Sequence, residues 1–296
     1  MKTKTLFIIA IIFLASCGNK SGNYDASGSF EATEVLVSAQ ASGQIMSLNV
    51  TEGQTLTVGQ ILGYIDTIQL SLKRKQLLPN MRAVDSRMYN VPVQIASLRE
   101  QIAKQKTELA RFQNLLKSNA ATQKQVDDIA SSIDVLQKQL DAQMATMSSA
   151  NRSILNESEA LQIQIEQIDD LLRKSIISSP IDGTVLAKYA EAGEVAAQGR
   201  PLFRVGDMEN LFLRAYITSD QISQMKLGDK VRVFADFGKE MKEYAGTITW
   251  ISDKAEFTPK TIQTRNERAN LVYAVKISVK NDGFLKSGMY GEIKLK

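Results

Sequence analysis

The chain has 296 residues, with 36 Lys or Arg against 32 Asp or Glu, no histidine and one cysteine, Cys17, a length that suits two or three small domains. These counts exclude a Cys/His zinc site, a Ser-His or Cys-His catalytic pair and a disulfide within one chain, and leave room only for an enzyme built on carboxylates or lysines. The formal charge of +4 gives no basis for a nucleic-acid partner, which needs a concentrated basic surface, so we expect no nucleic acid. Because the lack of histidine and of a second cysteine removes most catalytic and metal-binding chemistry, we also expect no catalysis and no cofactor or metal.

The first residues, MKTKTLFIIAIIFLASC, have the pattern of an export signal. Two lysines precede the apolar run Leu6–Leu14, which is too short to span a bilayer, since spanning needs about 20 residues. The ending Leu-Ala-Ser-Cys is similar to a bacterial lipobox, so we predict removal of a signal peptide, residues 1–16, and lipidation of Cys17. An ordinary signal peptide with an accidental cysteine is the alternative. The Gly/Ser/Asn-rich residues 17–29 are then expected to be a flexible tether.

Two segments far apart in the chain share one pattern. The first is SGQIMSLNVTEGQTLTVGQIL, residues 42–62, and the second is GTVLAKYAEAGEVAAQGRPL, residues 183–202. A shift of 140 aligns them without a gap, at the pairs Gly43 and Gly183, Gly53 and Gly193, Gly59 and Gly199, Ile45 and Val185, Leu62 and Leu202, Ile65 and Val205. We expect each glycine to lie in a turn whose backbone conformation would be strained for a residue with a β-carbon. Two unrelated hairpins are the alternative, but the match predicts two halves of one β domain, residues 30–66 and 176–208.

Between these halves, residues 67–175 carry apolar residues at heptad spacing, which predicts an antiparallel coiled-coil hairpin with its tip at 117–123. Facing positions should then have numbers with a constant sum, and pairs such as Leu116 with Val126, or Ile102 with Leu140, give 241 or 242. At the tip, Asn119 is suited to a left-handed helix end, and Thr122 with Gln125 has the spacing of a capping box.

Two prolines, Pro79 and Pro92, fall within the outgoing helix of this hairpin. The sequence Ser148–Asn151 lies opposite Pro92, so a kink or joint is expected there, although the choice between the two prolines stays open. Because the heptad phase continues past both prolines, the outgoing helix is expected to keep its seam, including Met88, along the whole hairpin.

The remaining residues, 209–296, alternate in the manner of β-strands and predict a small β-barrel domain. The expected strands are Leu211–Ile217, Lys230–Phe234, Tyr244–Ile251, Leu271–Val279 and Tyr290–Leu295. A short helix at Asp220–Met225, capped by Ser219, is expected after the first of them. The predicted fold class is therefore mixed α and β and elongated.

The two repeated halves resemble those of a biotinyl or lipoyl carrier domain, but the joining segment Asp66–Gln69, where carriers hold the modified lysine, contains none. A split lipoyl-like domain with an inserted helical hairpin, behind a lipoprotein signal, resembles the HlyD family of periplasmic adaptor (membrane fusion) proteins. The resemblance covers essentially all of the chain after the signal. The stretch AEFTPKTIQTRNERANLVYAVKISV, residues 255–279, is similar to the YbhG-like branch, whose members serve ABC-type exporters.

In that family the hairpin tip docks onto a TolC-like outer-membrane channel through an Arg-x3-Leu-x6-Ser/Thr pattern, often followed by an Asp. Here Arg111, Leu115, Thr122 and Asp127 stand at that spacing. Each residue also has a purely structural explanation: a solvated face for Arg111, seam packing for Leu115 and an N-cap for Thr122. The resemblance further implies Gln198 as a candidate for a loop that narrows a central bore, with an ordinary solvated turn as its alternative.

The resemblance implies a periplasmic chain, lipid-anchored to the inner membrane of a Gram-negative bacterium. Several copies, six by family likeness, would link an inner-membrane transporter of the ABC type to a TolC-like outer-membrane channel. Two other functions remain open: a passive lipoprotein scaffold that tethers envelope layers, and a biotinyl or lipoyl carrier domain.

Overall fold

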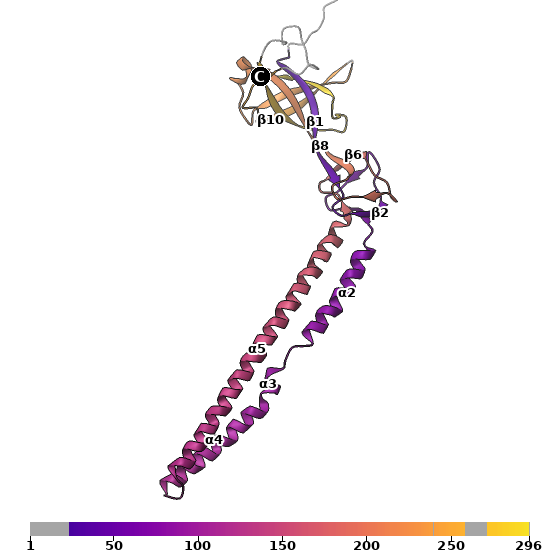
Figure 1. Ribbon diagram of the computed structural model, residues 1–296. Helices are drawn as coiled ribbons and strands as arrows, with labels where there is room; N and C mark the ends of the chain where they lie inside the picture. The colour runs from indigo at the N-terminus through magenta and orange to yellow at the C-terminus, as the bar shows by residue number, and fades with distance from the viewer. Residues whose placement is uncertain (1–23, 239, 258–270, 296) are drawn as a thin grey trace, which may run out of the picture.

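The computed structural model describes residues 24–238, 240–257 and 271–295. Three parts follow one another along an elongated molecule: a β-barrel domain, a β-sandwich domain and a long helical hairpin (Figure 1). The predicted class, mixed α and β with an inserted hairpin, is confirmed.

The sandwich domain consists of two sheets, each built from both sequence halves. Its short strands are β2 (Gly43–Leu48), β3 (Thr55–Leu56), β4 (Ile61–Ile65), β5 (Ile176–Ser178), β6 (Gly183–Lys188) and β7 (Val195–Ala196). The long strands β1 (Ala26–Ser38) and β8 (Pro201–Thr218) pass through it into the barrel. One sheet has the order β1-β8-β6-β3 and the other β5-β4-β2-β7, so neither half can form a sheet alone. Buried residues from both halves, including Ile45, Ile65 and Val205, fill the space between.

The shift of 140 is an internal two-fold symmetry of this domain. It carries β2 onto β6 and β3 onto β7 with identical bounds, and it exchanges the two sheets strand for strand. Hydrogen bonds repeat as well: the amide of Gly53 donates to the carbonyl of Val185 over 2.8 Å, and that of Gly193 donates to Ile45 over 2.7 Å. Both glycines have positive φ, 83° and 94°, in the region that strains other residues.

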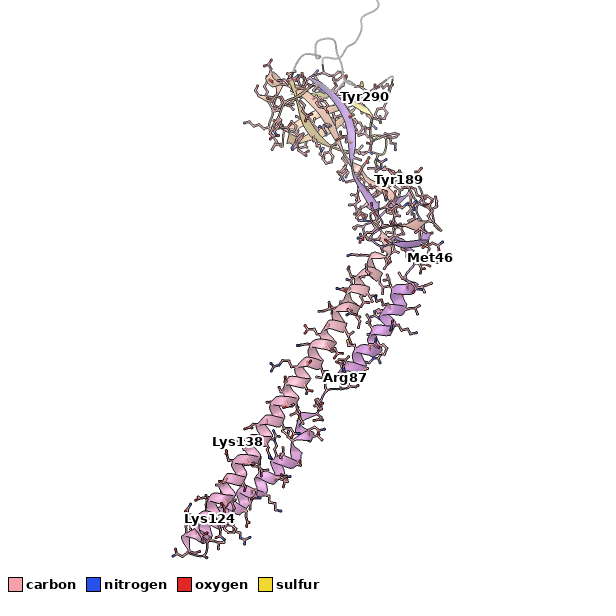
Figure 2. All side chains as sticks on the ribbon, viewed as in Figure 1. Met46, Arg87, Lys124, Lys138, Tyr189 and Tyr290 are labelled. Carbon is pink, nitrogen blue, oxygen red and sulfur yellow. The ribbon has the colours of Figure 1, made fainter. Side chains whose placement is uncertain are left out.

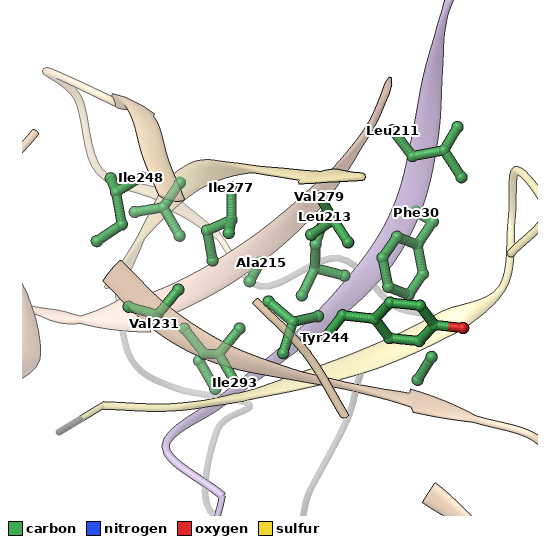
Figure 3. Packing of buried hydrophobic residues seen from close by; sticks show 14 of the residues in the cluster. Phe30, Leu211, Leu213, Ala215, Val231, Tyr244, Ile248, Ile277, Val279 and Ile293 are labelled. Atoms are coloured by element: carbon green, nitrogen blue, oxygen red, sulfur yellow. The ribbon is translucent and has the colours of Figure 1, made fainter. Parts of the chain in front are cut away.

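The barrel domain is closed by the strand ring β1-β13-β9-β10-β12-β8, with β8 returning to β1. The new elements are β9 (Lys230–Asp236), β10 (Met241–Ile251), β11 (Glu256–Phe257), β12 (Leu271–Lys280), β13 (Tyr290–Lys294) and the short helix α6 (Ser219–Ile222). Closure leaves no free strand edge in the ring and packs apolar side chains from every strand inside. Figure 3 shows fully buried Phe30 of β1 among side chains from β8, β10, β12 and β13.

Two boundaries differ from the sequence prediction. Residues 26–29, expected in the tether, and 30–32, expected in the sandwich, form the barrel part of β1 and pair with β13 and β8. The segment's Ala, Gly and Ser residues gave a weak strand signal, but Gly28 lies so close to the β8 backbone that a β-carbon would meet the Arg214 carbonyl at 2.0 Å. The short helix is also capped one residue earlier than expected, by Thr218.

The helical hairpin consists of α2 (Ile68–Asp85), α3 (Val91–Gln94) and α4 (Ala96–Lys117) on the outgoing leg and α5 (Gln123–Lys174) on the return. The 52-residue α5 is about 78 Å long at 1.5 Å per residue. Its seam is apolar, as predicted. Ile102 and Leu140 share one buried cluster near the tip, and Leu77 and Ile165 share another near the sandwich.

The outgoing leg has a joint before Pro92, where a kink or joint was expected. Helix α2 continues through Pro79 and ends at Asp85, and α3 begins with Pro92 in its first turn. Between them Asn151 of α5 holds the extended backbone: its side chain accepts from the Tyr89 amide over 2.8 Å and donates to the Tyr89 carbonyl over 3.0 Å. Met88, predicted in the seam, is 38% exposed because the chain leaves the helix there.

The joint yields a stability prediction. Asn151→Ala should free the joint and lower the cost of opening it locally by about 1–2 kcal/mol, since two hydrogen bonds are lost. Hydrogen–deuterium exchange at Tyr89 and the first turn of α3 would measure the effect. Asn156→Ala, an exposed asparagine on the same helix, is the matched control. Equal exchange in the two variants would contradict a role for Asn151 as the clamp.

Candidate functional site

The turn between α4 and α5 is a compact helix-to-helix connection at the far end of the hairpin (Figure 2). Asn119 adopts φ 58°, the only positive φ outside glycine among the described residues, and so reverses the chain. The amide of Ala120 then donates to the Leu115 carbonyl over 2.8 Å, which satisfies a carbonyl left free by the helix end. The expected left-handed cap at Asn119 is confirmed.

Thr122 starts α5 with the predicted capping box. Its hydroxyl accepts from the Gln125 amide, and the Gln125 side chain accepts from the Thr122 amide over 2.9 Å. One turn further, the Gln123 side chain donates to the Asp127 carboxylate over 2.8 Å. Both Thr122 and Asp127 are exposed, so the groups that define the start of the helix also lie on the surface of the tip.

Arg111 and Leu115 occupy the last two turns of α4, one turn apart on the same side of the helix. The Arg111 side chain is 67% exposed, with a long 3.5 Å contact to Glu108 and its guanidinium 5.9 Å from the Phe112 ring centre. An exposed pair of this kind contributes little to stability, so the arginine stays available to another partner. Leu115 is half-buried.

The hairpin therefore brings the four predicted residues to one end of the molecule, two on each leg. Arg111, Thr122 and Asp127 are exposed there, and Leu115 is half-buried. Among the described residues no group of three or more His, Cys, Asp or Glu could hold a metal ion, and no helix is long and apolar enough to cross a membrane.

The position that holds the lysine in carrier domains is occupied by the root of the hairpin. The Ile65 amide donates to the Ser175 carbonyl over 2.9 Å, which ties the two legs together at their base. The Asp66 carboxylate accepts from the amide of Ile68, where α2 begins. Helix α2 thus begins at the position where a carrier domain has the exposed hairpin that holds its lysine.

Gln198 lies exposed in the turn between β7 and β8, and its amide donates to the Ser42 hydroxyl over 3.1 Å. Its symmetry mate Val58 makes the same bond, to the Asp182 carboxylate, over 2.8 Å. The turn is thus a repeated structural feature, and only its outward side chain is specific. Cys17 and the signal peptide lie outside the described residues.

One surface was missed by the sequence reasoning. Each strand of the β5-β4-β2-β7 sheet exposes at least one large apolar side chain. Together these side chains are here called the apolar stripe: Met46, Ile61, Tyr64, Ile176 and Val195. Tyr64 and Ile176 are direct cross-strand partners. The alignment by 140 does not identify this surface, because Met46 and Ile176 have the apolar mates Leu186 and Leu36, and only some pairs, such as Tyr64 with Arg204, differ in character.

The symmetry mates of the stripe lie on the other sheet, which is more polar. Tyr64 corresponds to Arg204, which forms a 3.3 Å ion pair with Glu34. Beside it is a shallow hollow of about 510 Å³ lined by Glu34, Leu36, Tyr189, Arg200, Pro201 and Arg204. The two outer faces of a symmetric domain thus differ, one apolar and one hollowed and charged; Figure 2 labels Met46 on the first and Tyr189 beside the second.

Comparisons with known proteins agree on one family. Residues 33–207, more than half of the chain, match the family model described as "RND MFP, barrel-sandwich hybrid domain". A "UPF0194 membrane protein" of Yersinia pseudotuberculosis serotype O:3 (strain YPIII) is 29% identical over 285 residues, covering 88% of this chain and 86% of the relative. "UPF0194 membrane protein YbhG" of Salmonella gallinarum (strain 287/91 / NCTC 13346) is 28% identical, covering 90% and 87%.

Among solved structures, MacA from Actinobacillus actinomycetemcomitans has the same fold. It superposes with a TM-score of 0.55 at 19% identity, covering 90% of this chain and 76% of the other. The resemblance drawn from the sequence is thereby confirmed, and the chain belongs to the membrane fusion protein family that carries the barrel-sandwich hybrid domain.

Proposed function

We propose that this protein is the periplasmic adaptor of a tripartite export system, joining an inner-membrane transporter to a TolC-like outer-membrane channel. The observation that carries the proposal is the hairpin tip, where Arg111, Leu115, Thr122 and Asp127 stand together at the end of a 52-residue helix. A long arm with a specific contact surface at its end suits a protein that works by reaching a partner. No bond is made or broken in this role.

The ABC class of transporter is supported by the likeness of residues 255–279 to the YbhG-like branch; residues 258–270 of that stretch lie outside the described residues. Lipidation at Cys17 would anchor the chain in the inner membrane, with the other parts in the periplasm. The terminus of the described chain fits this, because Asp25 sits at the barrel end opposite the hairpin.

Self-association, with six copies as the family implies, is supported by the apolar stripe. A rigid sheet that exposes five large apolar side chains is typical of a protein contact surface. The stripe and the hollow lie on different faces, so a contact between them is head-to-tail and generates a ring when it closes. Gln198, in a turn of the same domain, is our candidate for the bore of that ring.

A passive scaffold would need the rod but not the tip residues. A carrier domain would need a lysine in the tight hairpin that joins the two halves, and residues 66–69, which occupy that place here, have none. The adaptor function therefore accounts for both the long hairpin and the residues at its tip, which neither alternative does. A biotin or lipoyl adduct on the mature protein, detected by mass spectrometry, would overturn it.

The charge at the tip gives the first test. Arg111→Asp should abolish crosslinking of the hairpin to a co-expressed outer-membrane channel and raise sensitivity to an exported compound, because a repulsive charge replaces the docking cation. Arg152→Asp, at an exposed position on the shaft of α5, is the control and should leave both unchanged. Normal crosslinking and export in Arg111→Asp would favour the scaffold.

Thr122 is expected to act both as a helix cap and as a docking group. Thr122→Ala should destabilise the start of α5 by about 1 kcal/mol through loss of the cap, seen as faster amide exchange at Gln125. Thr122→Asn retains a capping oxygen but changes the exposed shape, so it should keep the helix protected and still lose channel crosslinking. Retained crosslinking in Thr122→Asn would reduce Thr122 to a cap.

The head-to-tail contact is tested with the only cysteine removed. In a Cys17→Ser background, Tyr64→Cys combined with Leu36→Cys should give a ladder of disulfide-linked oligomers, because stripe and hollow meet between neighbours. Tyr64→Cys alone should stay monomeric on a non-reducing gel. Dimers of the single variant would indicate a symmetric stripe-to-stripe contact, which would rule out the proposed ring.

A further inference from the structure

The barrel end opposite the hairpin is where the described chain begins, and its first residues are fixed to the barrel. The Asp25 amide donates to the Ile293 carbonyl over 2.9 Å, and the Asp25 carbonyl accepts from the Gln221 side chain over 2.5 Å. The Asp25 carboxylate accepts from the amide of Leu295 over 2.6 Å. Whatever precedes Tyr24 thus starts from one defined point.

The same end presents an exposed apolar pair. Phe257 of β11 and Leu271 of β12 are direct cross-strand partners, 83% and 52% exposed. They belong to neither the barrel core nor the sandwich core. A phenylalanine this exposed on a strand leaves most of its apolar surface in water, which favours burial against something outside the described residues.

The strand register places this pair beside the start of the chain. Ser27 of β1 lies opposite Tyr216 of β8, which lies opposite Ala274 of β12. Leu271 and Phe257 continue past that level in the direction of Asp25. Three strand spacings of about 4.8 Å separate β1 from β11 by roughly 14 Å, so the pair and the fixed terminus lie on one end surface.

A lipid anchor at Cys17 would bring a bilayer to this surface. The seven steps from Cys17 to Tyr24 span at most about 25 Å when fully extended, at 3.3–3.6 Å per residue. The anchor is then at most about 39 Å from Phe257, the length of the tether plus the distance between β1 and β11. Tethering also raises the effective concentration of membrane, so that two apolar side chains suffice where they would be too weak alone.

We propose that Phe257 and Leu271 contact the lipid surface directly, entering the boundary between headgroups and acyl chains, and so hold the barrel end against the membrane. This inference rests on the proposed lipid anchor at Cys17. It adds a second point of attachment to the anchor, which fixes the orientation of the barrel and hence the direction in which the arm rises.

The described charges at this end are balanced; residues 258–270, which carry Lys260, Arg265 and Arg268 against Glu267, lie outside the described residues. Among the described residues its exposed lysines are matched in number by carboxylates: Lys226, Lys230, Lys254 and Lys294 against Asp220, Asp229, Asp253 and Glu256. Attraction to anionic lipids needs a basic excess. An apolar contact by Phe257 and Leu271 should therefore form on neutral phosphatidylcholine without any anionic lipid.

The chain offers a clean reporter, because Trp250 is its only tryptophan. In the lipidated full-length protein carrying Trp250→Phe, Phe257→Trp places a single fluorophore in the proposed contact. In phosphatidylcholine vesicles, this tryptophan should emit at shorter wavelength than in a Cys17→Ser version of the protein, which lacks the anchor, in detergent-free buffer. Its fluorescence should also fall when the lipids carry bromine on their acyl chains. Phe284→Trp in the same background is the matched control, since Phe284 is 64% exposed at the sandwich end of the barrel, and it should show neither change.

Three other results would each overturn the inference, for different reasons. If mass spectrometry finds no lipid on Cys17, the chain has no lipid anchor, and both the proposed attachment and this contact are wrong. Lipidated protein without bromine quenching at position 257 contradicts the membrane contact alone and leaves the adaptor function standing. A shift to shorter wavelength that bromine does not quench shows that protein, rather than lipid, covers the pair.

Discussion

The architecture depends on one local constraint: the two ends of a long insertion must meet at the same edge of one sheet. Strands β4 and β5 are neighbours in that sheet although the hairpin separates them in sequence, and the Ile65 amide bonds to Ser175 where the two legs leave it. An antiparallel hairpin meets the constraint at any length, because its legs always return to their starting point. The sandwich can therefore fold as it does in a chain without an arm, and the arm's length is free to suit its purpose.

The internal symmetry gives this domain two equivalent outlets. A shift of 140 carries the pair β4 and β5 onto β8 and β1. From the first pair the chain continues into α2 and α5, and from the second it continues as paired strands into the barrel (Figure 1). A shift in register between Ala32 and Thr33 marks the passage from sandwich to barrel. The domain thus acts as a connector whose two ends were specialised separately, one as a helical arm and one as a β-ribbon.

Much of this was predictable because its signals are local. Glycines such as Gly53 and Gly193 report a backbone conformation, heptads report a buried seam, and Thr122 with Gln125 reports a helix start. A joint near Pro92 was expected, but the departure of Met88 from the seam was not, since Leu77 with Ile165 and Ile102 with Leu140 both sum to 242 and the seam has the same register on both sides of the break. What interrupts the helix is a long-range clamp by Asn151. The apolar stripe could not be predicted at all until each strand was assigned to a sheet.

The arm's precision rests on polar contacts more than on its apolar seam. Few side chains of the hairpin are fully buried, and a thin seam of interchangeable aliphatic residues permits the legs to slide by a heptad. Two polar contacts between the legs oppose this: the 2.5 Å ion pair of Arg74 with Asp169 near the base, and the hydrogen bonds of Asn151 to Tyr89 at the joint. Since α5 runs unbroken from sandwich to tip, it alone sets the reach. The outgoing leg, broken but fastened, fixes the direction in which the tip residues face.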